Sequence, residues 1–292
     1  MKILTIHNRK GGVGKTALAV QFAYDLASRG YRTVLVEFDG QRNASSALAR
    51  GKQAAVAPFS SLAVFNGEAG ELPEAPLVCV AAEDGMDRMY DRGSARYNEF
   101  LNNLATWFYA LRKGNKVDVC LIDNAPGEDI RWGAGMVTAD AVILPTTLRQ
   151  ETIEGVSSFI NHGAYGFRRV KFGSPKTETT PALAPLNPKL LFLGILPTLV
   201  QRAAIESTAL QWLVSKYPDN MFRLSDGHYA NLKHRIAVAD AQKQGVFIGA
   251  MKTKESREVW AEWKPVMDEI IRRLELPAPI PMSSSEEPAH VS

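Results

Sequence analysis

The amino-acid sequence predicts an α/β fold, a doubly wound and mostly parallel sheet flanked by helices. Short apolar runs alternate along the chain with longer segments of helical periodicity, which is the pattern of successive strand–helix units. The runs are almost continuously apolar, as expected for strands whose two faces are both covered by helices. A glycine-rich turn joins the first run to the first helical segment, as in many nucleotide-binding sheets.

The apolar runs are the predicted strands, and the periodic segments between them are the predicted helices. The strands are expected at residues 3–7, 33–38, 77–80, 117–122, 141–144 and 190–196. The helices are expected at residues 15–29, 94–113, 151–168, 203–216 and 255–274. In the first helix Leu18, Phe22 and Leu26 repeat at a spacing of four, and Gly30 is a natural stop.

The last predicted helix is strongly amphipathic. Its apolar side chains form one stripe, which we interpret as a core-facing surface: Val259, Trp260, Trp263, Val266, Met267, Ile270, Ile271 and Leu274. The opposite face carries charges of both signs: Glu262, Lys264, Asp268, Glu269, Arg272 and Arg273. A membrane-surface helix would instead concentrate lysine and arginine on its polar face, so lipid attachment through this segment is disfavoured.

Length and composition favour one large globular domain. The chain has 292 residues, of which 46% are apolar, so it can form a full core. We assign residues 1–276 to a single domain. Residues 277–292, rich in Pro, Ser and Glu, are expected to be a disordered tail, and residues 171–189 an irregular exposed loop. No apolar run approaches the ~20 residues that span a bilayer, and no signal peptide precedes the first strand, so we expect a cytoplasmic protein.

Several chemically capable residues have structural interpretations. Cys79 and Cys120 each lie inside an apolar run and are expected to be buried core thiols. The five histidines show no metal-ligand spacing, and His7, at the end of the first strand, is expected to be structural. A net charge of +3 permits a nucleic-acid partner without requiring one.

The segment from Lys10 to Thr16, Lys-Gly-Gly-Val-Gly-Lys-Thr, has the residue types of a phosphate-binding loop. Glycines let the backbone approach a phosphate closely, so its N–H groups can surround the anion. Lys15 can reach the terminal phosphates, and the Thr16 hydroxyl can bind Mg²⁺. The strict phosphate-loop pattern requires glycine where Arg9 stands, and a second lysine, Lys10, follows it instead.

Two acids follow later strands. Asp39 stands in the segment Glu37-Phe38-Asp39-Gly40, just after the second strand. Asp123 follows the apolar run that ends at Ile122 and is succeeded by a Pro-Gly turn. Carboxylates at the carboxyl edge of such a sheet lie where ligands bind and suit a Mg²⁺ shell.

These motifs together resemble those of the ParA/MinD family of ATPases, which carry a deviant Walker A phosphate loop with a leading lysine. The resemblance covers about residues 1–250. It implies a P-loop NTPase fold, ATP and ADP as nucleotides, and Mg²⁺. It implies catalytic roles for Lys10, Lys15 and Asp39, and Mg²⁺ contacts by Thr16, Asp39 and Asp123. The implied nucleotide-binding residues are Lys10, Gly11, Gly12, Val13, Gly14, Lys15, Thr16, Ala17 and Thr198.

The resemblance also implies a mode of action. The expected reaction is slow, partner-stimulated hydrolysis of ATP to ADP and phosphate, with Asp39 orienting the water. Lys10 would reach the nucleotide of a second copy, so that ATP drives formation of a homodimer. Residues 124–132 would form a switch that senses the γ-phosphate.

The short ParA partition ATPases are the most similar branch, and they imply partition of a plasmid, chromosome or other cargo. The ATP-bound dimer would then bind duplex DNA without sequence preference and associate with the nucleoid. A centromere- or cargo-binding partner protein would stimulate hydrolysis. The candidate DNA contacts are Arg168, Arg169, Lys171, Lys233, Arg235 and Lys243. At the position where the family carries a DNA-contacting arginine, this chain has Ala237.

Three alternatives remain open at this point. The first is a MinD-like positioning ATPase that associates with membranes. The second is a redox ATPase similar to the nitrogenase iron protein, which needs cysteines at a dimer seam. The third is a phosphate-loop ligase of the dethiobiotin-synthetase type, which usually lacks the leading lysine.

Overall fold

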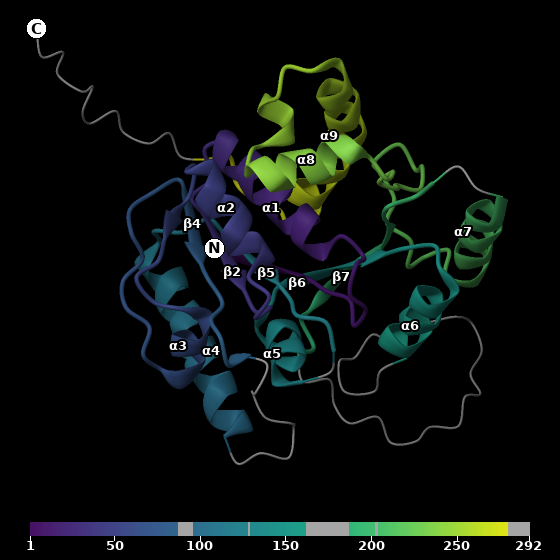
Figure 1. The fold of residues 1–292 in the computed structure, drawn as a ribbon. Coiled ribbons are helices and arrows are strands. Elements are labelled where there is room, and N and C mark those ends of the chain that lie inside the picture. The colour runs from purple at the N-terminus through teal and green to yellow at the C-terminus, as the bar shows by residue number, and fades with distance from the viewer. Residues whose placement is uncertain (87–95, 128, 162–186, 202–203, 280–292) are drawn as a thin grey trace, which may run out of the picture.

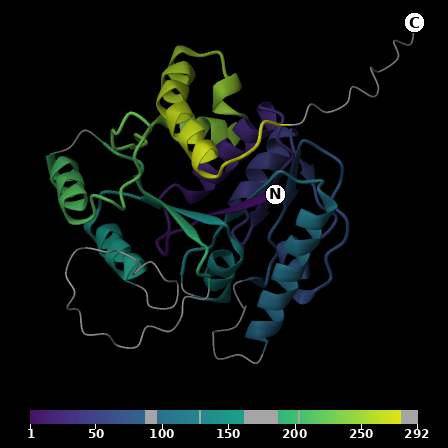
Figure 2. The same cartoon turned by 180° about the vertical axis from the view of Figure 1, so that it is seen from behind.

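A computed structural model describes residues 1–86, 96–127, 129–161, 187–201 and 204–279. The centre of the fold is a seven-stranded sheet in the order β3-β4-β2-β5-β1-β6-β7, and every neighbouring pair is parallel (Figures 1 and 2). The strands are β1 (Lys2–Ile6), β2 (Thr33–Glu37), β3 (Ala55–Val56), β4 (Leu77–Val80), β5 (Val119–Asp123), β6 (Ala141–Thr146) and β7 (Leu191–Pro197). The predicted doubly wound parallel sheet is confirmed.

Helices cover both faces of the sheet. They are α1 (Lys15–Ser28), α2 (Asn43–Gly51), α3 (Ser61–Asn66), α4 (Tyr97–Gly114), α5 (Ile130–Thr138), α6 (Gln150–Ile160), α7 (Ala204–Lys216), α8 (Ile236–Gln244) and α9 (Lys254–Arg273). Figure 1 shows α1, α2, α8 and α9 on one side of the sheet and α3 to α6 on the other, with α7 beyond β7. Successive side chains of a strand point to opposite faces of the sheet, so both faces need a layer of helices. In β1, Leu4 and Ile6 pack on the side of α1 and α9, and Ile3 packs on the side of α4.

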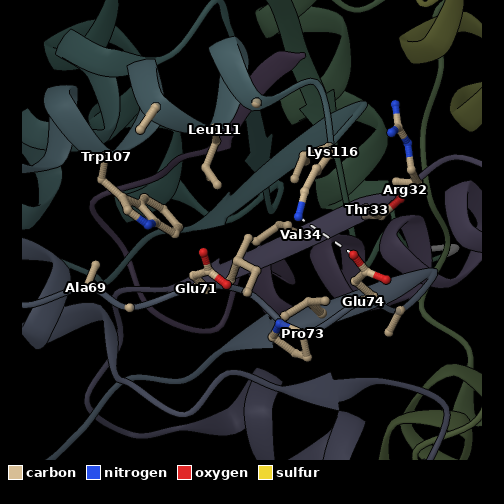
Figure 3. Close-up of a pocket in the computed structure, with 17 residues that line it drawn as sticks. Arg32, Thr33, Val34, Ala69, Glu71, Pro73, Glu74, Trp107, Leu111 and Lys116 are labelled. Atoms are coloured by element: carbon tan, nitrogen blue, oxygen red, sulfur yellow. Dashed lines mark ion pairs between the residues drawn. The ribbon is translucent and has the colours of Figure 1, made fainter.

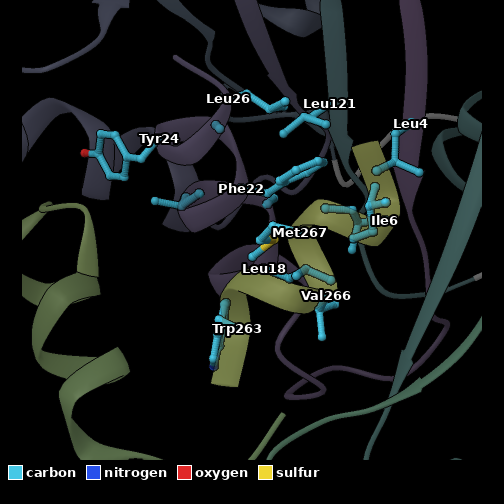
Figure 4. Close-up of a cluster of buried hydrophobic side chains, with 14 of the residues drawn as sticks. Leu4, Ile6, Leu18, Phe22, Tyr24, Leu26, Leu121, Trp263, Val266 and Met267 are labelled. Atoms are coloured by element: carbon cyan, nitrogen blue, oxygen red, sulfur yellow. The ribbon is translucent and has the colours of Figure 1, made fainter. Parts of the chain in front are cut away.

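The largest core lies between α1, α9 and the sheet (Figure 4). Leu18, Phe22 and Leu26 are buried along α1, as their spacing predicts, and Trp263 and Met267 of α9 pack against them. The apolar stripe of α9 is therefore core. Glu269, which the sequence places on the charged face, is also buried, because Arg272, Arg273 and Ser225 all donate hydrogen bonds to its carboxylate.

Most predicted elements agree with the structure within a few residues. The strand β3 and the short helices α2, α3, α5 and α8 have no counterpart in the prediction. Helix α6 is described only to its end at Ile160, and residues 162–168 of the expected helix lie outside the described residues. So do most of the expected irregular loop and of the expected tail. Within the ranges described, no helix is long and apolar enough to cross a membrane.

Two helices approach each other unusually closely at a pair of glycines. A Cβ on Gly245, which follows α8 with φ +70°, would lie 2.1 Å from the carbonyl oxygen of Ala47 in α2. A Cβ on Gly51 would lie 1.7 Å from the carbonyl oxygen of Gly245. Real side chains do not fit at such distances, so the absence of both side chains allows α8 to pack on α2.

Candidate nucleotide site

The loop that joins β1 to α1 is held in place by its neighbours. The Asn8 side chain donates a hydrogen bond to the carbonyl of Pro145 (2.8 Å) and accepts one from the Lys10 N–H (2.9 Å). The hydroxyl of Thr198 donates to the Val13 carbonyl (2.8 Å). These contacts join the loop to the ends of β6 and β7. Sequence reasoning gave Asn8 no role, although an asparagine directly between a strand and a glycine-rich turn is a usable signal.

The glycines give the loop the backbone geometry that the motif predicts. Gly12 and Gly14 have φ values of +70° and +82°, which side chains of L-residues rarely tolerate. Gly14 stands at the N-cap of α1, so the positive end of the helix dipole and its first free N–H groups face the concave side of the loop. Gly11 is exposed, and Ala17 packs against the core behind the loop. The arrangement can hold an anion.

Lys15 lies under this loop. Its side chain is nearly buried, and its Nζ donates to the Lys10 carbonyl at 2.9 Å. Burial lowers the pKa of Lys15, while the nearby carboxylates of Asp123 and Asp39 oppose that shift. The ammonium is thus held between the loop and two acids, the position required of a group that contacts phosphate.

Asp123 ends β5, the strand between β1 and β2, and its side chain is fully buried. Neither carboxylate oxygen has a hydrogen-bond partner of standard geometry among the described residues. Burial raises the pKa of Asp123, and the nearby Thr16 hydroxyl and Lys15 partly offset the rise. A buried carboxylate with unused oxygens is costly unless a cation joins it, so these residues fit a Mg²⁺ ion.

Glu37 is the last residue of β2 and Asp39 follows it in the next loop, but the two acids have different surroundings. Asp39 is partly exposed and accepts a hydrogen bond from the Gln41 N–H (3.0 Å). Glu37 is fully buried and accepts bonds from the N–H groups of Ala44 (2.7 Å) and Ser45 (3.3 Å), at the start of α2. Burial raises the pKa of Glu37, and these donors limit the rise. Glu37 therefore fixes the Asp39 loop, a role that the sequence pattern did not reveal.

The segment after Asp123 forms a second polar cluster. The amide of Asn124 contacts the Thr5 hydroxyl (3.3 Å) and Nδ1 of His7 (3.2 Å). His7 is buried and its ring lies 4.9 Å from that of Trp132, so its expected structural role is consistent with its surroundings. The Gly127 N–H donates to the Arg9 carbonyl (3.0 Å). The predicted switch segment is thereby in direct contact with the phosphate loop.

Asp129 connects the same segment to β2. Its carboxylate accepts the α5 N–H of Arg131 at 2.9 Å and pairs with the Arg131 guanidinium, which also donates to the Phe38 carbonyl at 3.4 Å. Phe38 immediately precedes Asp39. The loop carrying Asp39 and the loop after Asp123 are therefore linked through one buried arginine.

Lys10 and Thr198 have different surroundings. Lys10 is exposed at the rim of the loop, and its side chain has no hydrogen bond or ion pair to the part of the chain that the structure describes. Thr198 is buried behind the loop, where its hydroxyl contacts Val13. The expected role of Thr198 in nucleotide binding is therefore indirect in this geometry, through support of the loop.

The candidate DNA contacts are only partly described. Arg168, Arg169 and Lys171 lie outside the described residues. Lys233 and Arg235 both pair with Glu262 of α9, the lysine at 2.9 Å. Lys243 is exposed. Ala237 is buried in the core, so the outward positions at the start of α8 are Arg235 and the exposed Ile236.

The chain is similar to several known proteins. A family model described as AAA domain matches residues 1–71, which include the phosphate loop and Asp39. The protein IncC of Escherichia coli is 27% identical over 292 residues, covering 94% of this chain and 71% of IncC. The chromosome partitioning protein ParA of Caulobacter vibrioides is 28% identical over 211 residues, covering 69% and 71%. An ATP complex of a Cyanothece McdA variant has the same fold, with a TM-score of 0.70, 14% identity, and coverage of 92% and 96%.

Proposed function

We propose that this chain, which belongs to the ParA/MinD family of ATPases and is a ParA-type positioning ATPase, partitions DNA or another cargo through an ATP-dependent homodimer. Hydrolysis of ATP to ADP is slow until a partner protein bound to the cargo or to a centromere-like DNA site stimulates it. The ATP-bound dimer binds duplex DNA without sequence preference and so associates with the nucleoid. The similarity to the chromosome partitioning protein ParA of Caulobacter vibrioides supports this choice of cargo.

One observation carries the proposal. The phosphate loop, Lys15, Asp123 and Asp39 meet at the carboxyl edge of β1, β5 and β2, while Lys10 stays exposed at the loop's rim. A lysine that served its own phosphate site would be held inward, as Lys15 is. An exposed cation at the rim is placed to meet the phosphates of a second copy.

The residues divide the work of phosphoryl transfer. Mg²⁺, held by Thr16 and Asp123 with Asp39 nearby, would neutralise charge on the phosphates. Lys15 and the loop N–H groups hold the phosphate oxygens, and Asp39 orients water for in-line attack. Charge donated in trans can raise such rates by roughly 10³–10⁵, which is the role we give to Lys10.

The dimer test compares two variants, Lys10→Ala and Lys113→Ala. Lys113 is exposed on α4, far along the chain from the phosphate loop, so its variant is the control. Light scattering is measured with a non-hydrolysable ATP analogue and Mg²⁺. We expect the control to dimerise like the unmodified protein, whereas Lys10→Ala binds the analogue but stays monomeric. Equal dimerisation and equal turnover of both variants would contradict the proposal.

DNA binding is tested separately by anisotropy on duplexes of unrelated sequence. We expect micromolar binding with ATP, little with ADP, and release in high salt, as phosphate contacts require. Arg235→Ala should weaken binding, and Glu262→Gln should strengthen it, because Glu262 neutralises both Lys233 and Arg235. Equal binding in ADP and ATP would refute the coupling.

The membrane alternative has less support. The apolar side chains of α9 that could enter lipid, such as Val259, Trp263 and Ile270, are buried against the sheet. Co-sedimentation with anionic vesicles in ATP would detect this activity. The redox alternative is also disfavoured, because Cys79 and Cys120 are fully buried within β4 and β5.

A further inference from the structure

A cavity lies at the opposite edge of the sheet from the phosphate loop. It has a volume of about 690 Å³ and is formed by the starts of β2 and β4, the last turns of α4 and the loop of residues 69–75. Figure 3 shows Trp107 and Leu111 of α4 facing Glu71, Pro73 and Glu74 of that loop. Pockets of 300–1,000 Å³ accommodate small organic ligands.

The wall of this cavity is mainly apolar. Val34 and Val78 come from the sheet, Trp107 and Leu111 from α4, and Leu72 from the loop. Trp107 is fixed by edge-to-face packing on Phe59, with ring centroids 6.2 Å apart. An apolar body of ligand size would therefore displace water from a preformed wall, which is favourable.

The cavity is lined by two cationic and two anionic side chains, which differ in their pairing. Arg32 is neutralised by Asp118 (2.6 Å) and also donates to the carbonyl of Asn115. Lys116 pairs with Glu74 at 3.6 Å (Figure 3). Glu71 has no hydrogen bond or ion pair to any residue in the described ranges. One carboxylate is thus left without a counter-charge at the edge of an apolar cavity.

The end of α4 also faces the cavity. Leu111 and Gly114, in the last turn of the helix, line the cavity. The final carbonyls of a helix have no partners within it and carry the negative end of its dipole. Cations are favoured near such an end, although Arg112 and Lys113 of the same turn offset part of this negative end, and Arg112 is itself paired with Asp140.

We propose that this cavity binds a small amphipathic organic cation, an apolar body that carries one amine or guanidinium group. The apolar part occupies the space between Trp107, Leu111 and Val34, and the cation pairs with Glu71 at the mouth. The site is separate from the nucleotide site, and the proposal does not depend on the function proposed above.

The test uses three probes that share one apolar body: 4-phenylbutylamine, 4-phenylbutan-1-ol and 4-phenylbutyrate. Dissociation constants are measured by ligand-observed NMR titration of the full chain. We expect the amine to bind roughly 2- to 5-fold more tightly than the alcohol, the gain typical of one exposed ion pair, and the carboxylate most weakly. Amine affinity equal to or below that of the alcohol would overturn the assignment.

Two variants locate the binding. Glu71 is exposed, so Glu71→Gln should not disturb the fold. It should reduce the affinity for the amine to that for the alcohol and leave the affinity for the alcohol unchanged. Ala110→Phe places a ring in the cavity from α4 and should abolish binding of all three probes, whereas Ala105→Phe, exposed on the same helix but outside the cavity, should not. Binding that survives Ala110→Phe in a folded protein would place the probes elsewhere and refute the proposal.

Discussion

Replacing Glu269 by glutamine should cost this protein a measurable, pH-dependent part of its stability. The Glu269 carboxylate is 2% exposed and accepts hydrogen bonds from Arg272 (2.6 and 2.9 Å), Arg273 (2.7 Å) and the Ser225 hydroxyl (2.7 Å). Arg273 also donates to the carbonyls of Leu193 in β7 and Arg223. The carboxylate thereby holds α9 to the edge of the sheet.

The size of the effect follows from the pKa. Hydrogen bonds from Arg272, with those from Arg273 and Ser225, lower the pKa of Glu269 from 4.5 to about 2 despite its burial. A shift of that size corresponds to about 3 kcal/mol of stability at neutral pH. Because the folded-state pKa is depressed, this contribution is complete above pH 4.5 and is lost as the pH falls toward 2. At pH 3.5 about 2 kcal/mol should remain.

The assay is urea unfolding of the unmodified protein and Glu269→Gln at pH 7 and at pH 3.5. The difference between the two free energies of unfolding cancels the contribution of the carboxylates that both proteins share. Glu99→Gln, on an exposed stretch of α4, is the matched control and should change stability by less than ~0.5 kcal/mol. A Glu269→Gln difference that is below ~1 kcal/mol at pH 7, or that grows on acidification, would refute the reasoning.

Three further predictions concern the packing and the site. Gly245→Ala should lower stability by roughly 2–3 kcal/mol in thermal unfolding, because a left-handed residue gains a Cβ 2.1 Å from the Ala47 carbonyl; an unchanged melting temperature would show that the helices separate freely. Glu37→Gln should reduce ATP turnover more than ATP affinity, since it loosens the loop that carries Asp39; unchanged turnover would limit Glu37 to a structural role. Thr198→Val should weaken ATP binding about 5-fold, the effect of ~1 kcal/mol for one lost buried hydrogen bond to Val13; unchanged calorimetric affinity would count against loop support.

The parts of the fold that sequence reasoning missed are short, since β3, α2, α3, α5 and α8 have nine residues or fewer. Strand β3 has two residues, and α3 has six, so neither shows a repeat that could be recognised. The first N–H groups of helix α2 donate to the Glu37 carboxylate, a partner that lies seven residues from Ala44. Helix α8 packs closely on α2 at Gly51 and Gly245. Both α2 and α8 therefore make contacts with residues outside their own segments, which a local pattern does not reveal.

The burial of Glu269 and the pairing of Lys233 and Arg235 illustrate the same limit for side chains. A helical repeat assigns a carboxylate to the polar face, but whether that face meets solvent or an arginine depends on what packs beside it. The cavity between α4 and the 69–75 loop has no sequence signature for the same reason. It is a space left between elements rather than a property of any one of them.

The sequence by itself determined the sheet, the phosphate loop and the two acids at its edge, because each depends on residue types at short spacings: apolar runs, glycines that permit positive φ, and carboxylates that directly follow strands. Only the tertiary structure decided which of these groups are buried, paired or exposed. Burial and charge compensation depend on neighbours brought together from distant segments, as when β5 inserts between β1 and β2 and encloses Asp123 beside Lys15.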